Sequence, residues 1–154
     1  PESADEWLAS ADSHNALEQL RTALTAQLTR LREETDSGFV IVIGEGMSAP
    51  LLAEALAGGD GGKVDALIVL GPYLPLAKLN LAVGDTLAAV QAPLLDLLMV
   101  EDHPLATQGA EARRSAAKLR YLAHYRQRQL PLATNSDSSA LNNEVKAFLR
   151  YLGW

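Results

Sequence analysis

The chain has 154 residues, of which 48% are hydrophobic, and a formal net charge of −6 at pH 7. This length suits one domain with its own hydrophobic core, and the acidity excludes a general nucleic-acid binder, whose surface would be basic. The sequence contains no cysteine, which excludes disulfides, thiolate zinc sites and cysteine nucleophiles. No run of about 18 apolar residues occurs, so we expect no transmembrane segment.

The amino-terminal segment is polar, and we predict a flexible arm over residues 1–14 and a single domain over 15–154. Leucines then recur three and four positions apart, which places one apolar stripe on a helix. The spacing predicts this helix over 15–34.

Strands that are buried under helices on both sides appear in a sequence as continuous apolar runs. Three such runs predict strands over 39–43, 66–70 and 93–100. The first run, Phe39–Ile43, is apolar at every position, so both of its faces are predicted to be buried. A shorter strand is expected over 129–133, where Pro131 suits the edge of a sheet.

Helical patterns separate and follow these strands. They predict helices over 48–57, 85–91, 110–127 and 141–152. Helices that alternate with apolar strands indicate right-handed crossovers. We therefore predict an α/β fold, an open parallel sheet of about four strands with helices on both faces.

A glycine-rich turn joins the first predicted strand to the helix that follows it. Gly44-Glu45-Gly46-Met47-Ser48-Ala49 fits the pattern G-x-G-x-x-A, whose glycines let the backbone approach a pyrophosphate. That pattern also needs an acid at the end of the next strand to hold the ribose. Here the next strand ends with Leu70-Gly71-Pro72, so a dinucleotide-binding domain that uses Gly44-Glu45-Gly46 is the lowest-ranked alternative.

The same turn resembles the nucleophile elbow of the α/β-hydrolases, G-x-S-x-G. The alignment places Gly46 at the position of the nucleophile, and Ser48 is predicted to cap the following helix. Asp102 falls where the acid of the catalytic triad would stand. The triad histidine would precede the terminal helix, but residues 134–139 contain none. The resemblance therefore implies a degenerate elbow (Gly44, Glu45, Gly46, Met47, Ser48) and no confident catalytic residue.

The resemblance covers residues 15–154 and matches the C-terminal half of the hydrolase fold. Together with the elbow, Tyr125-Arg126-Gln127 and the terminal Leu152-Gly153-Trp154 are similar to a bacterial hydrolase-like family of unknown function from gamma-proteobacteria. That family implies a secretion leader and a periplasmic or secreted protein, with a cytoplasmic one left open. A chain that begins with Pro1 fits either a removed leader or a piece of a longer gene product.

Loops at the carboxyl ends of parallel strands line the usual ligand crevice of an open sheet. We expect six residues to line it: Glu45, Gly46, Met47, Tyr73, Asp102 and His103. We expect no cofactor and no metal site, because the adjacent Glu101, Asp102 and His103 are poorly spaced for converging on one ion. The leading hypothesis is a non-catalytic binding or interaction module. The alternative is a divergent hydrolase of the esterase class with displaced catalytic residues.

The first predicted strand has no strand before it in the sequence to cover its outer edge. An apolar, unpaired edge invites pairing with another chain. We therefore expect Phe39–Ile43 to meet either a second copy, in a homo-oligomer, or an upstream half of the same gene product.

Overall fold

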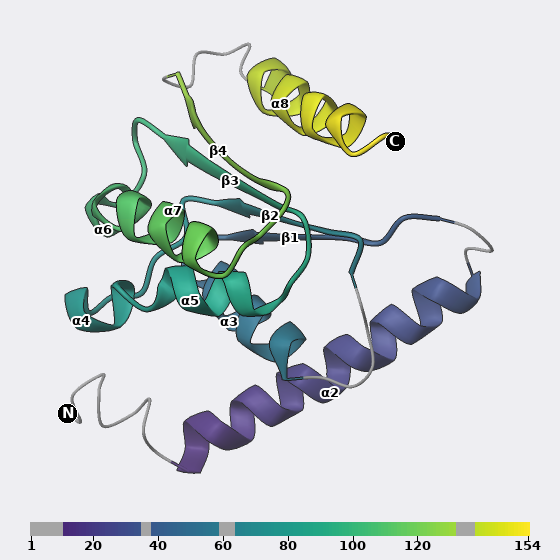
Figure 1. Ribbon diagram of the computed structural model, residues 1–154. Helices are drawn as coiled ribbons and strands as arrows, with labels where there is room; N and C mark the ends of the chain where they lie inside the picture. The colour runs from purple at the N-terminus through teal and green to yellow at the C-terminus, as the bar shows by residue number, and fades with distance from the viewer. Residues whose placement is uncertain (1–10, 35–37, 59–63, 132–137) are drawn as a thin grey trace.

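The structure is a computed structural model, and it describes residues 11–34, 38–58, 64–131 and 138–154. Its centre is one sheet of parallel strands in the order β1-β2-β3-β4 (Figure 1). The strands are β1 (Ile41–Glu45), β2 (Ala66–Leu70), β3 (Leu94–Met99) and β4 (Tyr125–Leu130). Every crossover therefore moves one step in the same direction across the sheet. The predicted open parallel sheet of about four strands is confirmed.

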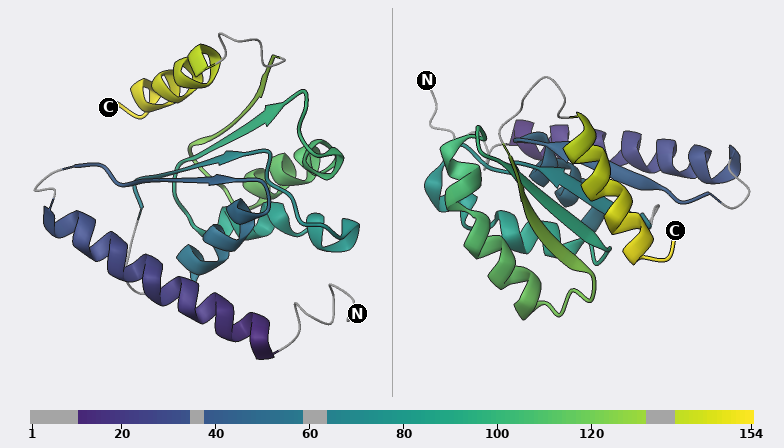
Figure 2. Two further views of the ribbon diagram at one scale, coloured as in Figure 1. Left: turned by 180° about the vertical axis from the view of Figure 1, so that it is seen from behind. Right: turned by 90° about the horizontal axis from the view of Figure 1, so that it is seen from above.

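One face of the sheet carries the helices that connect the strands. These are α3 (Ser48–Ala57), α5 (Val83–Ala89) and α7 (Ala110–Leu119). Small residues of α3, Ala49 and Ala53, are fully buried against Leu67 and Val69 of β2. Helix α2 (Ala11–Glu34) packs outside α3, and the short helices α4 (Ala77–Asn80) and α6 (Pro104–Gln108) lie near the carboxyl ends of the strands (Figures 1 and 2).

The opposite face is covered by α8 (Ser138–Tyr151), which among the described residues is the sole helix there (Figure 2). Its Phe148 is fully buried against the sheet residues Ile68, Leu95 and Leu97. Burying a side chain such as Phe148 contributes roughly 1.5–3 kcal/mol. Helices therefore lie on both faces, as the sequence predicts.

The sequence misplaces the junction between α7 and β4. A helix over 110–127 and a strand over 129–133 are predicted, but α7 ends at Leu119 and β4 begins at Tyr125. Tyr121 takes the left-handed conformation (φ 53°) and is 91% exposed, and the Leu122 N–H donates to the Ala117 carbonyl oxygen. This is a helix-ending motif that normally contains glycine, so the sequence carries little signal for it.

Several other boundaries differ from the prediction. Strand β1 spans Ile41–Glu45 rather than 39–43, β3 spans Leu94–Met99 rather than 93–100, and α8 spans Ser138–Tyr151 rather than 141–152. Helix α2 begins at Ala11 rather than at residue 15, and residues 1–10 of the predicted arm lie outside the described residues. Helix α5 begins at Val83 rather than at residue 85, and the single turn α4 precedes it in a segment for which no helix is predicted. Positions 132 and 133 of the predicted last strand also lie outside the described residues.

The prediction that both faces of Phe39–Ile43 are buried is wrong. Phe39 is 56% exposed and Ile43 58% exposed. Strand β1 is the outermost strand and pairs with β2 alone in the described sheet. Ile41 still contacts the cluster under α8, and Phe39 stacks on Trp154 with ring centroids 3.9 Å apart. Helix α8 and the residues after it therefore cover the start of β1, whereas Ile43 farther along the strand is exposed.

Candidate functional site

The glycine-rich turn forms a tight elbow between β1 and α3. The Gly46 N–H donates to the Leu70 carbonyl oxygen at 2.8 Å, which fixes the turn to the end of β2. A Cβ atom on Gly44 would lie 2.7 Å from the Cα of Ala49. Glycine is therefore required at position 44 because the helix folds back so closely on the strand.

Gly46 takes the left-handed conformation (φ 54°), which glycine adopts without strain. A Cβ atom there would meet Cε1 of Tyr73 at 3.6 Å, an ordinary contact. The space above the turn could therefore hold a small side chain, although the sequence supplies none.

The prediction that Ser48 caps α3 is wrong. The residue before the helix is Met47, which makes no side-chain capping hydrogen bond. The Ser48 hydroxyl donates to the Glu45 carbonyl oxygen at 2.7 Å and accepts from the Glu45 N–H at 3.2 Å. It therefore holds the turn closed from inside.

Asp102 lies just beyond β3, and its carboxylate has a structural partner. Oδ2 accepts a hydrogen bond from the Met99 N–H at 2.6 Å. A Cβ atom on Gly71 (φ 51°) would lie 2.6 Å from the Asp102 Cγ, so glycine at position 71 makes room for this carboxylate. The acid thus closes the turn after β3 and packs on the end of β2.

Three of the predicted site residues come together above the elbow. The rings of Tyr73 and His103 stack with centroids 4.2 Å apart and planes 4° from parallel, and Tyr73 also stands beside Gly46. His103 Nδ1 accepts from the Leu105 N–H at 3.2 Å and caps α6. We call this region the elbow surface and define it as Gly46, Met47, Tyr73, Asp102 and His103. Glu45 lies at the end of β1 and is exposed.

A buried polar network that the sequence reasoning missed lies beneath this surface. Asp96 in the middle of β3 is fully buried, and Arg113 of α7 is 1% exposed. Arg113 Nε donates to Asp96 Oδ2 at 2.8 Å, and Nη2 donates to Oδ1 at 3.3 Å. A charge in the apolar strand Leu-Leu-Asp-Leu-Leu was the signal that could have revealed it, because buried charges are paired.

Two side chains of β4 complete the network. The Tyr125 hydroxyl and Gln127 Nε2 each donate to Asp96 Oδ2 at 2.9 Å. Residues two apart on a strand face the same side, which explains the spacing of Tyr125-Arg126-Gln127. Burial first, and then the Asp96 carboxylate, raise the pKa of Tyr125 far above that of an exposed tyrosine. Tyr125 therefore stays protonated and acts as a hydrogen-bond donor.

The network also holds the walls of the elbow surface. Arg113 Nη1 donates to the Pro72 carbonyl oxygen at 3.3 Å and to the Ala106 carbonyl oxygen at 2.9 Å. Pro72 precedes Tyr73, and Ala106 lies in α6, the helix that His103 caps. The buried Asn80 accepts from the Leu74 N–H at 3.0 Å and donates to the Leu105 carbonyl oxygen at 2.7 Å. Arg113 and Asn80 thus hold the stacked rings in place from below.

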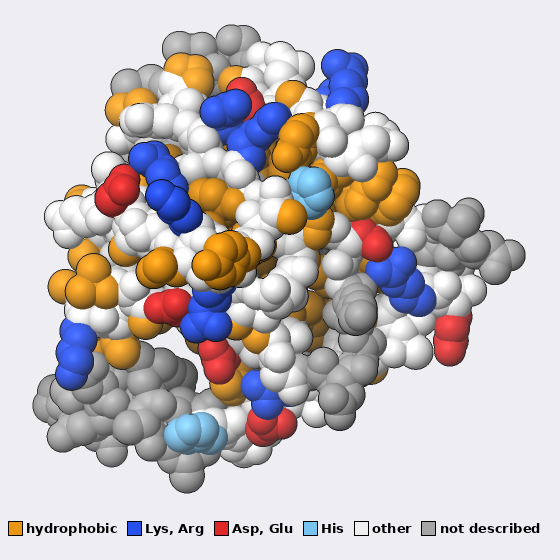
Figure 3. Space-filling model, viewed as in Figure 1, with side chains coloured by type: hydrophobic (Ala, Val, Ile, Leu, Met, Phe, Trp, Pro, Cys, Tyr) orange, Lys and Arg blue, Asp and Glu red, His pale blue; other side chains and the backbone are white. Residues whose placement is uncertain are grey.

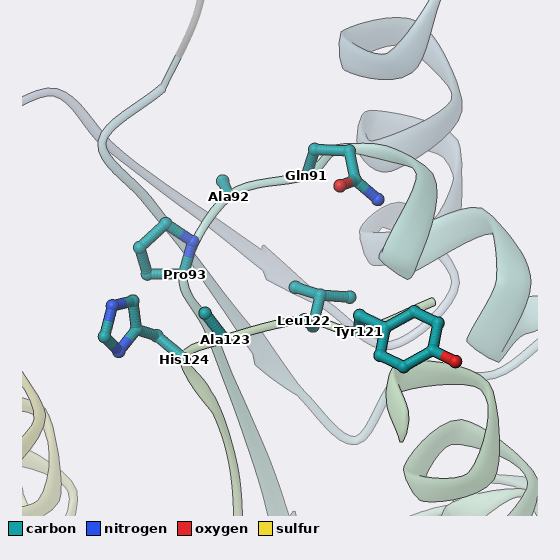
Figure 4. A pocket seen from close by; sticks show the side chains of 7 residues that line it. All are labelled: Gln91, Ala92, Pro93, Tyr121, Leu122, Ala123 and His124. Carbon is teal, nitrogen blue, oxygen red and sulfur yellow. The ribbon is translucent and has the colours of Figure 1, made fainter. Parts of the chain in front are cut away.

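A hollow of about 170 Å³ lies at the opposite, amino-terminal ends of β3 and β4. Figure 4 shows Pro93 and His124 at one end of it and Gln91 and Tyr121 at the other. Gln91 and Tyr121 both have positive φ. Each directly follows a helix end, at α5 and α7, so helix termination accounts for both conformations.

Three arginines, on α7, at its C-cap and on β4, are paired with acids. Arg114 contacts Glu111 at 3.1 Å, Arg120 contacts Asp85 at 3.1 Å, and Arg128 contacts Glu144 at 3.8 Å. Basic and acidic side chains accordingly lie close together on the face in Figure 3. In the described part of the chain, no group of three or more His, Asp or Glu side chains could hold a metal ion, and no helix there has the length and hydropathy to cross a membrane.

A family model for DUF3530, described as a protein of unknown function, matches residues 1–151. The chain belongs to the DUF3530 family. No curated protein matches the chain significantly.

Among solved structures, this DUF3530 chain is similar to an uncharacterized protein from Bacillus cereus ATCC 10987. The TM-score is 0.66 at 13% sequence identity, over 90% of this chain and 44% of that one. The chain thus spans less than half the length of this neighbour. At such low identity the likeness shows a shared fold alone.

The buried ion pair should be essential for stability. We expect Arg113→Ala to lower the free energy of unfolding by about 3–5 kcal/mol, because it leaves the Asp96 carboxylate buried without its charge partner. Urea unfolding followed by circular dichroism would measure this. The control is Arg120→Ala: its side chain is 48% exposed and pairs with Asp85, outside the network, so the loss should stay within about 1 kcal/mol. Equal losses in the two variants would contradict the assignment.

Tyr125 should make stability depend on pH in the alkaline range. An unfolded tyrosine has a pKa of about 10, and the folded pKa is higher, so the unfolded chain releases this proton first. The contribution is intact below pH 10 and is lost as the pH rises above it. We expect the wild type to lose up to about 1.4 kcal/mol per pH unit more than Tyr125→Phe above pH 10. Parallel pH profiles in urea unfolding would refute this.

Proposed function

We propose that this DUF3530 chain is a non-catalytic α/β-hydrolase-like domain that binds a small ligand at the elbow surface. The observation that carries the proposal is the backbone of Gly46, which is left-handed at a strand-to-helix turn and has room for a side chain. A hydrolase elbow uses such a turn to project its nucleophile above the sheet. Here the turn is present and the nucleophile is absent.

The neighbouring polar groups support a loss of catalysis. A triad needs an acid, a histidine and a nucleophile joined in one chain of hydrogen bonds. Asp102 instead binds the Met99 N–H, and His103 Nδ1 binds the Leu105 N–H. The Ser48 hydroxyl is held by the backbone of Glu45. Each candidate group is thus committed to a turn or a helix end.

The surface nevertheless suits binding. It lies at the carboxyl ends of parallel strands, where open α/β sheets bind their ligands. The stacked rings of Tyr73 and His103 offer a flat aromatic wall. Arg113 bonds to the backbone of Pro72 and Ala106 on either side of that wall and restrains it. A preorganised wall lowers the ordering cost of binding.

One compound, 4-nitrophenyl butyrate, tests both parts of the proposal. We expect it to shift the amide resonances of Gly46 and Met47 in NMR spectra without release of nitrophenolate above the buffer rate. Met47→Trp should abolish the shifts by covering the surface, since Met47 is exposed and caps nothing. Turnover above the buffer rate that disappears in Asp102→Ala would revive the esterase alternative. An absence of shifts at Gly46 and Met47 would refute binding at this surface.

We propose further that the free edge of β1 pairs with a strand of a second copy of the chain. Two observations support this: Phe39 and Ile43 are exposed, and no strand of the described residues pairs with the outer edge of β1. Natural proteins usually protect such an edge with charge, proline or a covering element. An upstream half of the same gene product is the other candidate for this edge.

Light scattering after size-exclusion chromatography tests the pairing. We expect a dimer at tens of micromolar, and Ile43→Lys should shift it to the monomer because the charge would lie in the paired strand. The control Leu81→Lys alters an equally exposed leucine between α4 and α5 (66% exposed) and should leave the dimer intact. A monomeric wild-type chain would argue against pairing between copies.

A further inference from the structure

An apolar groove of about 410 Å³ lies beside the elbow surface, between α2 on one side and α3, α4 and α5 on the other. Most of its lining is aliphatic. The aliphatic lining includes Leu17, Leu20, Pro50, Leu51, Leu74 and Leu79. Its volume falls in the range of small-molecule sites, roughly 300–1,000 Å³.

The groove exists because the two ends of α2 pack differently. Toward its carboxyl end, Leu28 is buried in a cluster with Val40 and Val64. Toward its amino end, Leu17 and Leu20 belong to the same stripe but stay half-exposed. Figures 1 and 2 show this end of α2 diverging from α4 and α5. The apolar stripe of α2 therefore continues past the point where the described residues bury it.

The lining restricts what can occupy the groove. Among the described residues that line it, His14 carries the single ring, which leaves little opportunity for ring stacking there. A polar ligand group lying against the leucines would lose its hydrogen bonds to water without replacement, which is costly. A flexible aliphatic chain meets neither limit, because its burial is favourable and non-directional.

The groove is continuous with the elbow surface. Met47, the residue before α3, lies four positions before Leu51, so the two side chains share one side of the first helical turn. Leu74 directly follows Tyr73 in the chain. Met47 and Leu51 are both exposed, at 45% and 41%. A chain lying in the groove would thus have one end beside Gly46.

We propose that the groove holds the tail of a single-chain aliphatic ligand, a fatty-acid-like molecule whose polar end reaches the elbow surface. This inference rests on the proposed function, since it names the ligand class of the same site. Each methylene that enters the groove tightens binding about threefold to fourfold. Affinity therefore rises with chain length until the groove is full.

Titration of the full chain with octanoate, decanoate and dodecanoate, below their micelle-forming concentrations, tests the length dependence. We expect one saturable site per chain and a gain of about tenfold for each two carbons. An absence of saturable binding by dodecanoate at 1 mM would overturn the proposal, whatever else fills the groove. Equal affinity for the three acids would overturn it as well.

Variants locate the site. Ala16→Phe fills the groove from an exposed position on α2, and Leu17→Gln makes its wall polar; each should weaken dodecanoate binding at least tenfold. Leu119→Gln on α7, at a 77% exposed position that is not part of the groove lining, should leave it unchanged. Binding that is unaffected by Ala16→Phe would place the fatty acid elsewhere and refute the groove. Circular dichroism confirms that each variant is folded.

The two proposals fail in different ways. Loss of dodecanoate binding in Ala16→Phe but not in Met47→Trp would support the groove and contradict a polar end at the elbow surface. Retention of the 4-nitrophenyl butyrate shifts, with no response of dodecanoate to Ala16→Phe, would support the elbow surface and refute the groove.

Discussion

The ion pair between Arg113 and Asp96 is the interaction on which the arrangement of this domain depends. Both charges are fully buried, and burying them would be prohibitive unless every polar atom found a partner. Arg113 finds two further partners in the carbonyl groups of Pro72 and Ala106, and Asp96 finds them in Tyr125 and Gln127. One guanidinium thereby joins β3, α6, α7 and the segment after β2. The ion pair inside the domain therefore helps to fix the segment after β2 and helix α6 at the carboxyl ends of the strands.

The sequence predicts the two central strands, β2 and β3, well because both are buried. A short, continuous apolar run such as Ala66–Leu70 is typical of a strand that is buried on both faces. The alternation of such strands with helices indicates an α/β fold. The errors occur where tertiary contacts decide. Tyr121 ends α7 in a conformation that favours glycine, and β4 is polar because two of its side chains serve Asp96. A search for apolar periodicity passes over both features.

The elbow was predictable for a different reason: it depends on glycines. The close approach of Ala49 explains Gly44, and the packing of the Asp102 carboxylate explains Gly71. Sequence reasoning located Tyr73, Asp102 and His103 near one another because the carboxyl ends of parallel strands share an edge. It did not foresee the stacking of Tyr73 on His103, nor the hydroxyl of Ser48 turned inward. Such details depend on side-chain geometry that spacing alone does not encode.

Helix α8 has a consequence for how the chain is made. In the described structure it alone shields the face of the sheet that includes Ile68, Leu95 and Leu97, and it follows all four strands in the chain. Proteins are synthesised from the amino terminus at about 5–20 residues per second. During translation the sheet can therefore assemble with its connecting helices before α8 has been synthesised, and this apolar face is then exposed to solvent. That interval is when the nascent chain most needs a chaperone, because bare sheet faces and free edges are the surfaces that aggregate.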